Sequence, residues 1–325
     1  MCLPMRFGIN VMLCEALSAS VSRLSEVLCV NTADELQSQR LLHGRGRCYA
    51  GLEQLTLDYH PGVVLLTLFA EYPALDVLLS ALTESINTSA QPETALIVQR
   101  RYLDGVPSEL IAGELPDKPL ARVGQSVFAL QYLAKQNIGF FLDMAPGRDW
   151  LAAVADGKKV LNLFSYTCAL SVVACAAGAE SVLNIDMSKA ALSVGRENHL
   201  LNDLPAKQHN IQFLAHDIMK SFGKLDKQGP YDVVVCDPPS FQKGSFVAEQ
   251  HYRRLLTRML PMLAPGADVL LCLNAPEMAA SFITDMTDEL WPEVRFVGRL
   301  SEHKDYPESD RERGLKLLQY KNPDY

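Results

Sequence analysis

The sequence predicts an α/β protein whose main domain contains a mostly parallel sheet of seven strands with helices on both faces. From Val160 onward, short runs rich in aliphatic and β-branched residues alternate with helical stretches, which is the pattern of βαβ units. The last two runs have no long helix between them, so we expect them to form an antiparallel pair. A length of 325 residues also leaves room for a second, smaller domain.

The seven strands follow in chain order. We expect them at residues 159–164, 181–186, 211–217, 231–237, 268–274, 294–300 and 315–321. We expect helices between them at residues 169–178, 188–203 and 245–264. Gly178 is placed to close the first helix and Ser188 to cap the second, while Pro261 stops or kinks the third near its end.

The first part of the chain has a different pattern. Residues 1–90 mix short helical and strand-like stretches and predict a small mixed α/β domain. Residues 91–135 predict a β-rich connecting segment, with strands at 94–102 and 126–134. Residues 136–325 form the predicted main domain.

Composition is typical of a globular protein, with 48% hydrophobic and 21% charged residues. No signal-peptide pattern and no run of about 18 apolar residues occurs, so we expect a cytoplasmic protein that does not cross a membrane. The eight cysteines are far apart, with no C-x-x-C pair and no clustered histidines. This spacing predicts neither a zinc site nor a disulfide framework.

A formal net charge of −8 argues against a protein that holds nucleic acid mainly by its overall charge. A nucleic-acid substrate would need local basic patches. Candidate patches are "HGRGRCY" at 43–49, Arg100 with Arg101, and "YRRLLTR" at 252–258. Each of these alone is equally consistent with a solvated loop or helix surface.

Polar residues follow four of the predicted strands, where ligands bind in open parallel sheets. The first strand leads into the small, polar turn 162–171, which opens a helix and can aim backbone N–H groups at an anionic group. Asp186 ends the second strand, 24 residues after Asn162, where a carboxylate can accept hydrogen bonds from both ribose hydroxyls. Asp217 and Asp237 end the next two strands. Asp217 alone is better explained as an N-cap, but the three acids together predict a nucleoside-containing cofactor.

The exit of the fourth strand reads "CDPPSF" at 236–241. Pro238 and Pro239 fix two φ angles, so they hold Asp237 in one direction. Its carboxylate can accept hydrogen bonds from a flat base, and Phe241 offers a stacking face. The alternative is a strand terminator with an exposed acid.

Six motifs in this order resemble class I S-adenosylmethionine-dependent methyltransferases, and more narrowly the ribosomal RNA large-subunit methyltransferase group. The motifs lie at 136–151, 160–179, 184–188, 196–204, 236–241 and 313–320. The resemblance implies a Rossmann-like domain, S-adenosyl-L-methionine as the cofactor and RNA, with ribosomal RNA favoured, as the substrate. It implies no metal.

The resemblance also implies roles for individual residues. The predicted cofactor-binding set is Phe140, Asn162, Phe164, Ser165, Tyr166, Thr167, Cys168, Asp186, Met187, Asp217, Ile218 and Asp237. In it, Asp186 binds the ribose, Asp217 faces the adenine, and the methionine part is lined by Asn162, Phe164, Ser165 and Tyr166. Gly139, Phe140 and Asp143 close over the cofactor, although Phe140 is equally well explained as a core aromatic. The predicted catalytic set is Asp237, Pro238, Pro239, Phe241 and Asn274.

The chain departs from the family pattern in two motifs. Cys168 stands where the family usually has glycine, and Asn137 with Ile138 replaces the usual Lys-Thr. Glycine allows positive φ or a close approach of the backbone to a ligand, and a cysteine side chain makes either harder. This departure predicts a reduced cofactor affinity or an altered pose.

The leading prediction is an RNA base methyltransferase. Carbon-5 methylation of cytosine needs a thiolate nucleophile, but the fifth strand exits as "CLNAPEM", where relatives with that chemistry have Ser-Cys-Ser. Cys236 and Cys272 are not well placed for it, whereas Asn274 is typical of members that methylate a ring nitrogen of guanine. The alternatives are a methyltransferase for a small molecule or a protein, which the acidic composition favours, and a non-catalytic cofactor-binding protein.

Overall fold

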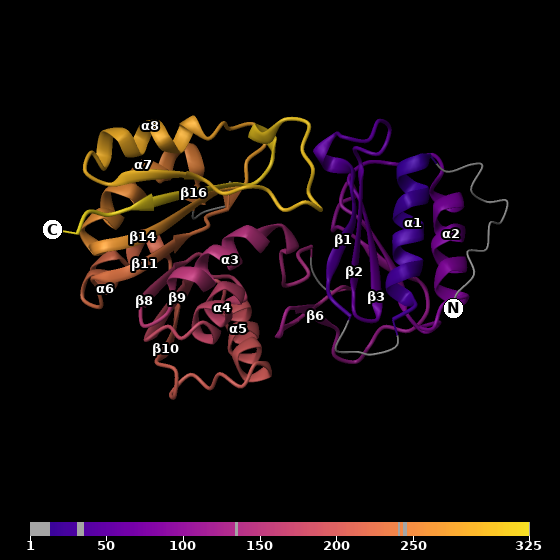
Figure 1. The fold of residues 1–325 in the computed structure, drawn as a ribbon, viewed down its shortest axis with the longest axis horizontal. Coiled ribbons are helices and arrows are strands. Elements are labelled where there is room, and N and C mark those ends of the chain that lie inside the picture. The colour runs from indigo at the N-terminus through magenta and orange to yellow at the C-terminus, as the bar shows by residue number, and fades with distance from the viewer. Residues whose placement is uncertain (1–13, 31–35, 134–135, 240, 243–245, 325) are drawn as a thin grey trace. The chain divides into compact units, whose positions relative to one another are not determined.

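The computed structural model describes residues 14–30, 36–133, 136–239, 241–242 and 246–324 (Figure 1). The chain forms two compact units. Unit 1 consists of Met1–Leu142 together with Lys304–Ser309, and unit 2 consists of Asp143–His303 with Asp310–Tyr325. Within the described residues, no helix has both the length and the hydropathy needed to cross a membrane.

Unit 2 contains a seven-stranded sheet in the order β10-β9-β8-β11-β14-β16-β15 (Figure 1). Its strands are β8 (Lys159–Leu163), β9 (Ser181–Asp186), β10 (Ile211–Ala215), β11 (Tyr231–Cys236), β14 (Leu263–Leu273), β15 (Arg295–Arg299) and β16 (Lys316–Lys321). The first five strands in the sheet are parallel, and β16 runs antiparallel to both β14 and β15. The predicted mostly parallel sheet and its antiparallel terminal pair are therefore confirmed.

Helices cover both faces of this sheet. The elements α3 (Ala145–Val154), α4 (Ala169–Ala176) and α5 (Lys189–Leu201) lie on one face, and α6 (Phe222–Asp226), α7 (Ala248–Met259) and α8 (Ser281–Leu290) on the other. On the second face, buried side chains such as Tyr252 and Trp291 share one hydrophobic core with Leu161 and Val234 of the sheet. The two faces reflect the alternation of side chains along each strand.

Two of the predicted boundaries can be compared directly with the structure. Ser188 caps α5 as predicted, because its side chain accepts a hydrogen bond from the Ala191 amide at 3.1 Å. The third helix ends at Met259, and a 3₁₀ turn that contains Pro261 follows it. The strand β14 then begins at Leu263, five residues earlier than predicted, because the proline ends the helix without a loop.

Unit 1 contains a five-stranded sheet in the order β1-β2-β3-β4-β5. The strands are β1 (Gln39–His43), β2 (Leu55–His60), β3 (Val63–Leu68), β4 (Ala95–Arg100) and β5 (Ser108–Ala112). The helices α1 (Glu15–Leu28) and α2 (Leu75–Asn87) pack against each other and share a hydrophobic core with the sheet. The segment 91–135 supplies β4 and β5 to this sheet, and β6 (Leu120–Val123) and β7 (Ser126–Ala129) to a separate hairpin.

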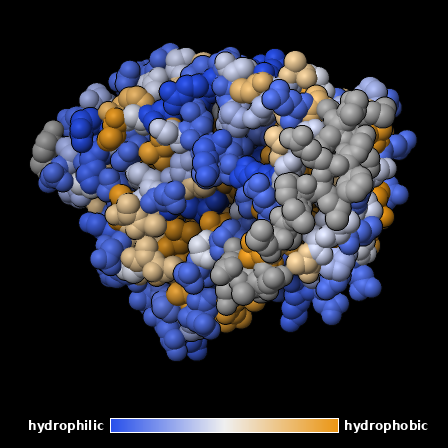
Figure 2. Space-filling view, turned by 45° about the vertical axis from the view of Figure 1, so that its right-hand side comes forward, coloured by the Kyte–Doolittle hydropathy of each residue, from blue (hydrophilic) through white to orange (hydrophobic). Residues whose placement is uncertain are grey.

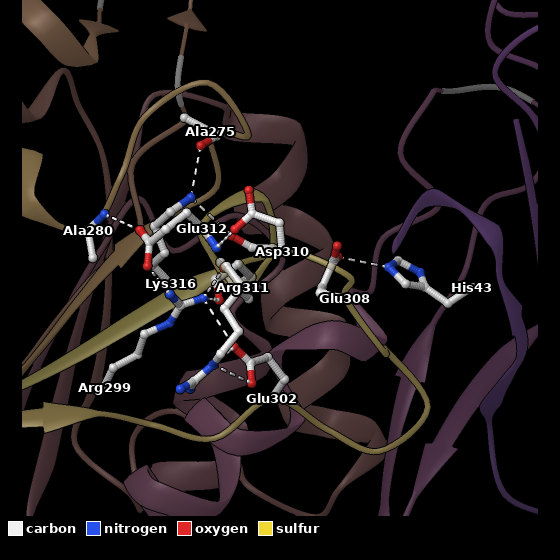
Figure 3. Close-up of polar contacts among 12 residues, drawn as sticks. His43, Ala275, Ala280, Arg299, Glu302, Glu308, Asp310, Arg311, Glu312 and Lys316 are labelled. Carbon is white, nitrogen blue, oxygen red and sulfur yellow. Dashed lines mark hydrogen bonds and ion pairs between the residues drawn. The ribbon is translucent and has the colours of Figure 1, made fainter. Parts of the chain in front are cut away.

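A strap from the C-terminal part of the chain, Lys304–Ser309, belongs to unit 1. Its Glu308 carboxylate lies 3.1 Å from the His43 imidazole (Figure 3). A Cβ atom on Gly46 would lie only 1.8 Å from the Pro307 carbonyl oxygen, so a glycine at position 46 is what allows the strap to pack this closely. The chain therefore leaves unit 2 after His303 and returns to it at Asp310.

Figure 2 shows mostly polar residues on the visible face, with hydrophobic residues in small groups. The exposed large hydrophobic residues are Leu103, Leu110, Leu133, Phe141, Met187, Leu200, Leu201, Phe296 and Val297. Scattered exposure of this kind is ordinary for a folded protein. Met187 is of interest because it follows Asp186 directly.

Candidate active site

The strand register brings two of the predicted acids to one rim of the sheet. Leu163, the last residue of β8, pairs with Ile185 on one side and with Cys236 on the other. The next residues in those neighbouring strands are Asp186 and Asp237. Adjacent strands lie about 4.8 Å apart, so the backbones at these two acids are about 10 Å apart, with the end of β8 between them. The rim therefore places two carboxylates on either side of one loop.

This loop, residues 164–168, is strained. Phe164, Tyr166 and Cys168 have positive φ angles of 57°, 46° and 60°, although none of them is glycine. Each such residue costs about 1 kcal/mol or more, and such strain tends to gather at functional sites. The loop is held in part by its backbone, because the buried Ser165 donates its N–H to the Ile185 carbonyl oxygen at 3.1 Å. The strain indicates that this backbone path serves a purpose beyond folding.

Asp186 is fixed by two backbone donors. Its Oδ2 accepts a hydrogen bond from the Tyr166 amide at 2.9 Å, and its Oδ1 accepts one from the Ser188 amide at 2.8 Å. A carboxylate oxygen can accept more than one hydrogen bond, so both oxygens keep capacity for a ligand. The neighbouring Met187 is 41% exposed and can contact the same ligand. The geometry suits an acceptor for paired hydroxyls.

Cys168 keeps the left-handed conformation that glycine normally adopts at its position. Its side chain is fully buried against Gly195 of α5, where an added Cβ would lie 2.6 Å from the Cys168 sulfur. Asn198 on the same helix donates to the Thr167 carbonyl oxygen at 2.9 Å. The cysteine is therefore accommodated by a glycine elsewhere, and the loop path is maintained. Because the side chain packs toward α5, a ligand contact at position 168 would come from the main chain.

Asn162 belongs to a buried polar network on the face covered by α4 and α5. It pairs in register with Asn184 and donates to its Oδ1 at 2.9 Å. Asn184 donates to Ser171 Oγ, which lies 2.9 Å from His199 Nε2. The side chain that we predicted to line a ligand is thus held in the interior, 2% exposed. Sequence reasoning missed the other three residues, although an asparagine at matching positions of two buried strands is a signal for such pairing.

Asp217 acts as an N-cap. It lies two residues beyond β10, and its Oδ1 accepts a hydrogen bond from the Met219 amide at 2.9 Å. Its Oδ2 lies 3.2 Å from Lys220 Nζ. Ile218 is buried in the 3₁₀ turn that Asp217 caps. The structure thus shows the capping role expected for Asp217 alone, and its contact with an adenine stays a prediction.

Asp237 has the most perturbed carboxyl group at the rim. Burial raises its pKa from 3.8 to about 7, and the nearby Asp143 carboxylate contributes in the same direction. Pro238 is buried and Pro239 partly buried, so the direction of the chain after β11 is fixed by packing as well as by the proline rings. At neutral pH this carboxyl is poised between its two protonation states, which suits a group that accepts a proton.

The two cysteines near Asp237 are poor nucleophiles. Cys236 and Cys272 are fully buried, and burial raises the pKa of both thiols well above its usual value. The negative charge of Asp237 acts in the same direction on both. Neither thiol will ionise readily at neutral pH.

The structure places three further predicted site residues, Asn274, Phe140 and Phe241, in different surroundings. Asn274 is exposed directly after β14, on the rim that also carries Asp237. Phe140 is 5% exposed in unit 1 and stacks on Phe128, with ring centroids 4.6 Å apart, as its core alternative expects. The side chain of Phe241 lies outside the described part of the chain, although its backbone pairs with Val247. Ligand contacts of Phe140 and Phe241 therefore stay predictions.

Comparison with known proteins identifies the family. A family model described as S-adenosylmethionine-dependent methyltransferase matches residues 39–321. The chain belongs to this methyltransferase family.

Named relatives agree with this assignment, and a solved structure has a similar fold. The methyltransferase is 29% identical over 275 residues to ribosomal RNA large subunit methyltransferase I of Shewanella amazonensis, covering 79% of this chain and 67% of the relative. It is 34% identical over 154 residues to the K/L enzyme of Shewanella sp. (strain MR-4), covering 45% and 21%. A structure described as a methyltransferase, SMU.776, complexed with SAH has a TM-score of 0.81 at 22% identity, covering 98% of this chain and 83% of that one.

The rim fits S-adenosylmethionine, the cofactor of this family. Asp186 is a fixed acceptor of the kind that ribose hydroxyls need, and the strained loop brings backbone groups next to it. Burial and the Asp143 carboxylate both raise the pKa of Asp237, and a sulfonium cation nearby would favour the charged form of this carboxyl. Among the residues that the structure describes, no group of three or more His, Cys, Asp or Glu side chains is arranged to hold a metal.

Proposed function

We propose that this methyltransferase methylates a base in RNA, and specifically in ribosomal RNA. The observation that carries the proposal is the row formed by Asp186, the strained loop 164–168 and Asp237 along one rim of the sheet. It would provide a cofactor site and a proton acceptor side by side. The relatives named above, which are called ribosomal RNA large subunit methyltransferases, support RNA as the substrate.

Asp237 would act on the base. Bound S-adenosylmethionine supplies a methyl group on a cationic sulfur, which leaves as a neutral thioether. As the base nitrogen forms its bond to the methyl carbon, the Asp237 carboxylate accepts the N–H proton. A carboxyl with a pKa of about 7 is suited to this step, since it can both take up and release a proton near neutral pH. Pro238 and Pro239 would keep it aligned with the base.

A nitrogen is favoured over cytosine carbon-5 as the methylated atom. The carbon-5 route begins with a thiolate that adds to the ring. Cys236 and Cys272 are buried with raised pKa values, so neither supplies a thiolate near neutral pH. Asn274 is exposed on the same rim, and its side chain carries a neutral hydrogen-bonding group that would suit the base edge.

Unit 1 would help to hold the RNA. The Arg45 guanidinium lies 4.0 Å from the centre of the Phe69 ring, and that of Arg101 lies 5.5 Å from it. Burial, together with the charge of Arg45, lowers the pKa of Arg101, so two like charges are held close together. A phosphate group would relieve their repulsion. Arg253 is a weaker candidate because Glu289 already pairs with it at 2.8 Å and 2.5 Å.

The test is a comparison of modified nucleosides in ribosomal RNA by mass spectrometry. Cells that lack the gene should lack one methylated nucleoside, and the wild-type protein should restore it. Asp237→Asn should not restore it, whereas Asp232→Asn should, because Asp232 lies at the opposite end of the same strand and accepts from the Lys159 amide. An unchanged nucleoside profile in the deletion strain would refute the ribosomal substrate. Methylation of a protein or small molecule instead would support the alternative that the acidic composition favours.

A further inference from the structure

Lys316 is a fully buried lysine at the rim of the sheet. It is the first residue of β16 and pairs in register with Leu273, the last residue of β14. Its Nζ donates to the Ala275 carbonyl oxygen at 2.9 Å and to the Gly314 carbonyl oxygen at 3.2 Å (Figure 3). The amine therefore bridges the segment that leaves β14 and the segment that enters β16.

Burial of this amine is unfavourable by itself. Desolvation lowers the pKa of Lys316, and the nearby Arg299 lowers it further, while Glu312 and other acids partly offset the effect. The next positions, Leu317 and Leu318, show that this part of the strand otherwise takes apolar side chains. A lysine here is explained by what its donors hold rather than by packing.

Glu312 provides a second anchor for the same loop. One of its carboxylate oxygens accepts a hydrogen bond from the Ala280 amide at 2.6 Å, and the other accepts from Arg299 at 2.9 Å (Figure 3). The loop 274–280 is thus held near its start by Lys316 and at its end by Glu312. Asn274, the first residue of this loop, is exposed on the rim that also carries Asp237.

The loop has little regular structure to hold it in place. Pro276 has no backbone N–H, so it can make no hydrogen bond as a donor. Side-chain anchors at Ala275 and Ala280 supply contacts that a strand or helix would otherwise give to the main chain.

We propose that Lys316 and Glu312 are positioning residues that fix the loop 274–280, so that Asn274 presents its side-chain amide to the base being methylated. This inference rests on the proposed RNA substrate. Neither residue touches the base. Both act through the main chain of the loop, and Asn274 makes the contact.

The experiment compares Lys316→Met with Lys321→Met. Methionine keeps the length of the side chain and removes its charge and donors. Lys321 is a matched control because it lies on the same strand at its other end and pairs with Asp268 at 2.9 Å. Each variant is assayed for methylation of large-subunit ribosomal RNA from cells that lack the gene, and for S-adenosylmethionine affinity by calorimetry. For Lys316→Met we expect kcat/KM for RNA to fall at least about tenfold, with cofactor Kd within about twofold. Lys321→Met should change neither.

Two further measurements separate positioning from general stability. If Lys316 acts through Asn274, the double variant Asn274→Ala with Lys316→Met should be no less active than Asn274→Ala alone. Hydrogen exchange of the peptide 274–280 should be faster in Lys316→Met and unchanged in Lys321→Met, and this readout needs no RNA. Glu312→Ala, which removes the acceptor of the Ala280 N–H, should also speed exchange at Ala280 and tests the second anchor in a variant with Lys316 intact.

The outcomes distinguish this inference from the proposed function. Wild-type-like RNA methylation by Lys316→Met would overturn the inference. So would a double variant that is less active than Asn274→Ala alone, or hydrogen exchange of the peptide 274–280 that is unchanged in Lys316→Met. A parallel loss of cofactor affinity would also overturn it, since that would indicate a general structural role. Failure of the wild-type protein to methylate the RNA would instead refute the substrate, and hydrogen exchange would still decide whether the anchors hold the loop.

Discussion

Replacement of Asp237 by asparagine should remove a pH-dependent loss of folding stability. Burial and Asp143 raise the pKa of this carboxyl from 3.8 to about 7 in the folded protein. Between these values the folded state binds more protons than the unfolded state, so the free energy of unfolding falls as pH rises. The contribution is fully present below about pH 4 and is lost as pH passes through 7. Asparagine does not titrate, so the variant lacks this pH-dependent contribution to the free energy of unfolding.

The rise in the Asp237 pKa from 3.8 to about 7 corresponds to at most about 4 kcal/mol. Asp237 is only half-buried, so solvent screening should reduce this to about 2 kcal/mol. The assay is urea unfolding of both proteins, without cofactor, at pH 5 and pH 8. The difference between the free energies of unfolding of the two proteins cancels the contributions of the other titrating groups. Part of this contribution is already lost below pH 5, so we expect the wild type to lose about 1 kcal/mol relative to Asp237→Asn between these pH values. A difference that does not depend on pH would refute the burial argument.

Two other variants test the loop and the RNA contact. Gly195→Ala should destabilise the wild type by about 2 kcal/mol because of the clash with Cys168, but should be neutral or stabilising in a Cys168→Gly background, where the alanine improves the helix. Thermal unfolding checks this, and an equal effect in both backgrounds would contradict it. Arg45→Gln should weaken RNA binding and lower the slope of log affinity against log salt concentration by about one, because it removes one of the two neighbouring positive charges of Arg45 and Arg101. Arg253→Gln should change both less, because the Arg253 guanidinium pairs with Glu289. A binding titration at several salt concentrations decides between these outcomes.

The main sheet could be predicted from the sequence because its strands are buried apolar runs bounded by clear turns. The position of Asp186 and Asp237 at one rim could also be predicted, because the carboxyl ends of parallel strands share one edge. The strap Lys304–Ser309 could not, because its contacts join parts of the chain more than 250 residues apart and leave no local pattern. The start of β14 was misplaced because a strand that follows a helix without a loop has no boundary signal.

The packing and contacts of individual side chains were harder to predict. The sequence could not show how Cys168 fits its loop, because the space that Gly195 leaves for it can only be seen once α5 is packed. The reduced cofactor affinity or altered pose that Cys168 implies stays a prediction. Asn162 has the residue type of a ligand contact but faces an identical partner on the next strand. Lys316 carried one signal in the sequence, a lysine between apolar residues of a strand, and that signal indicates burial without showing what the amine holds.

The affinity of the Asp186→Ala variant for S-adenosylmethionine tests the central claim most directly. Asp186 is held by two backbone amides on the rim, and its loss should weaken binding by about 2 kcal/mol or more, which is about 30-fold in Kd. Asp268→Ala is the control, because Asp268 lies on the same sheet and pairs with Lys321. We expect calorimetry to show the loss only for Asp186→Ala. Wild-type affinity in that variant would contradict a cofactor site at this rim.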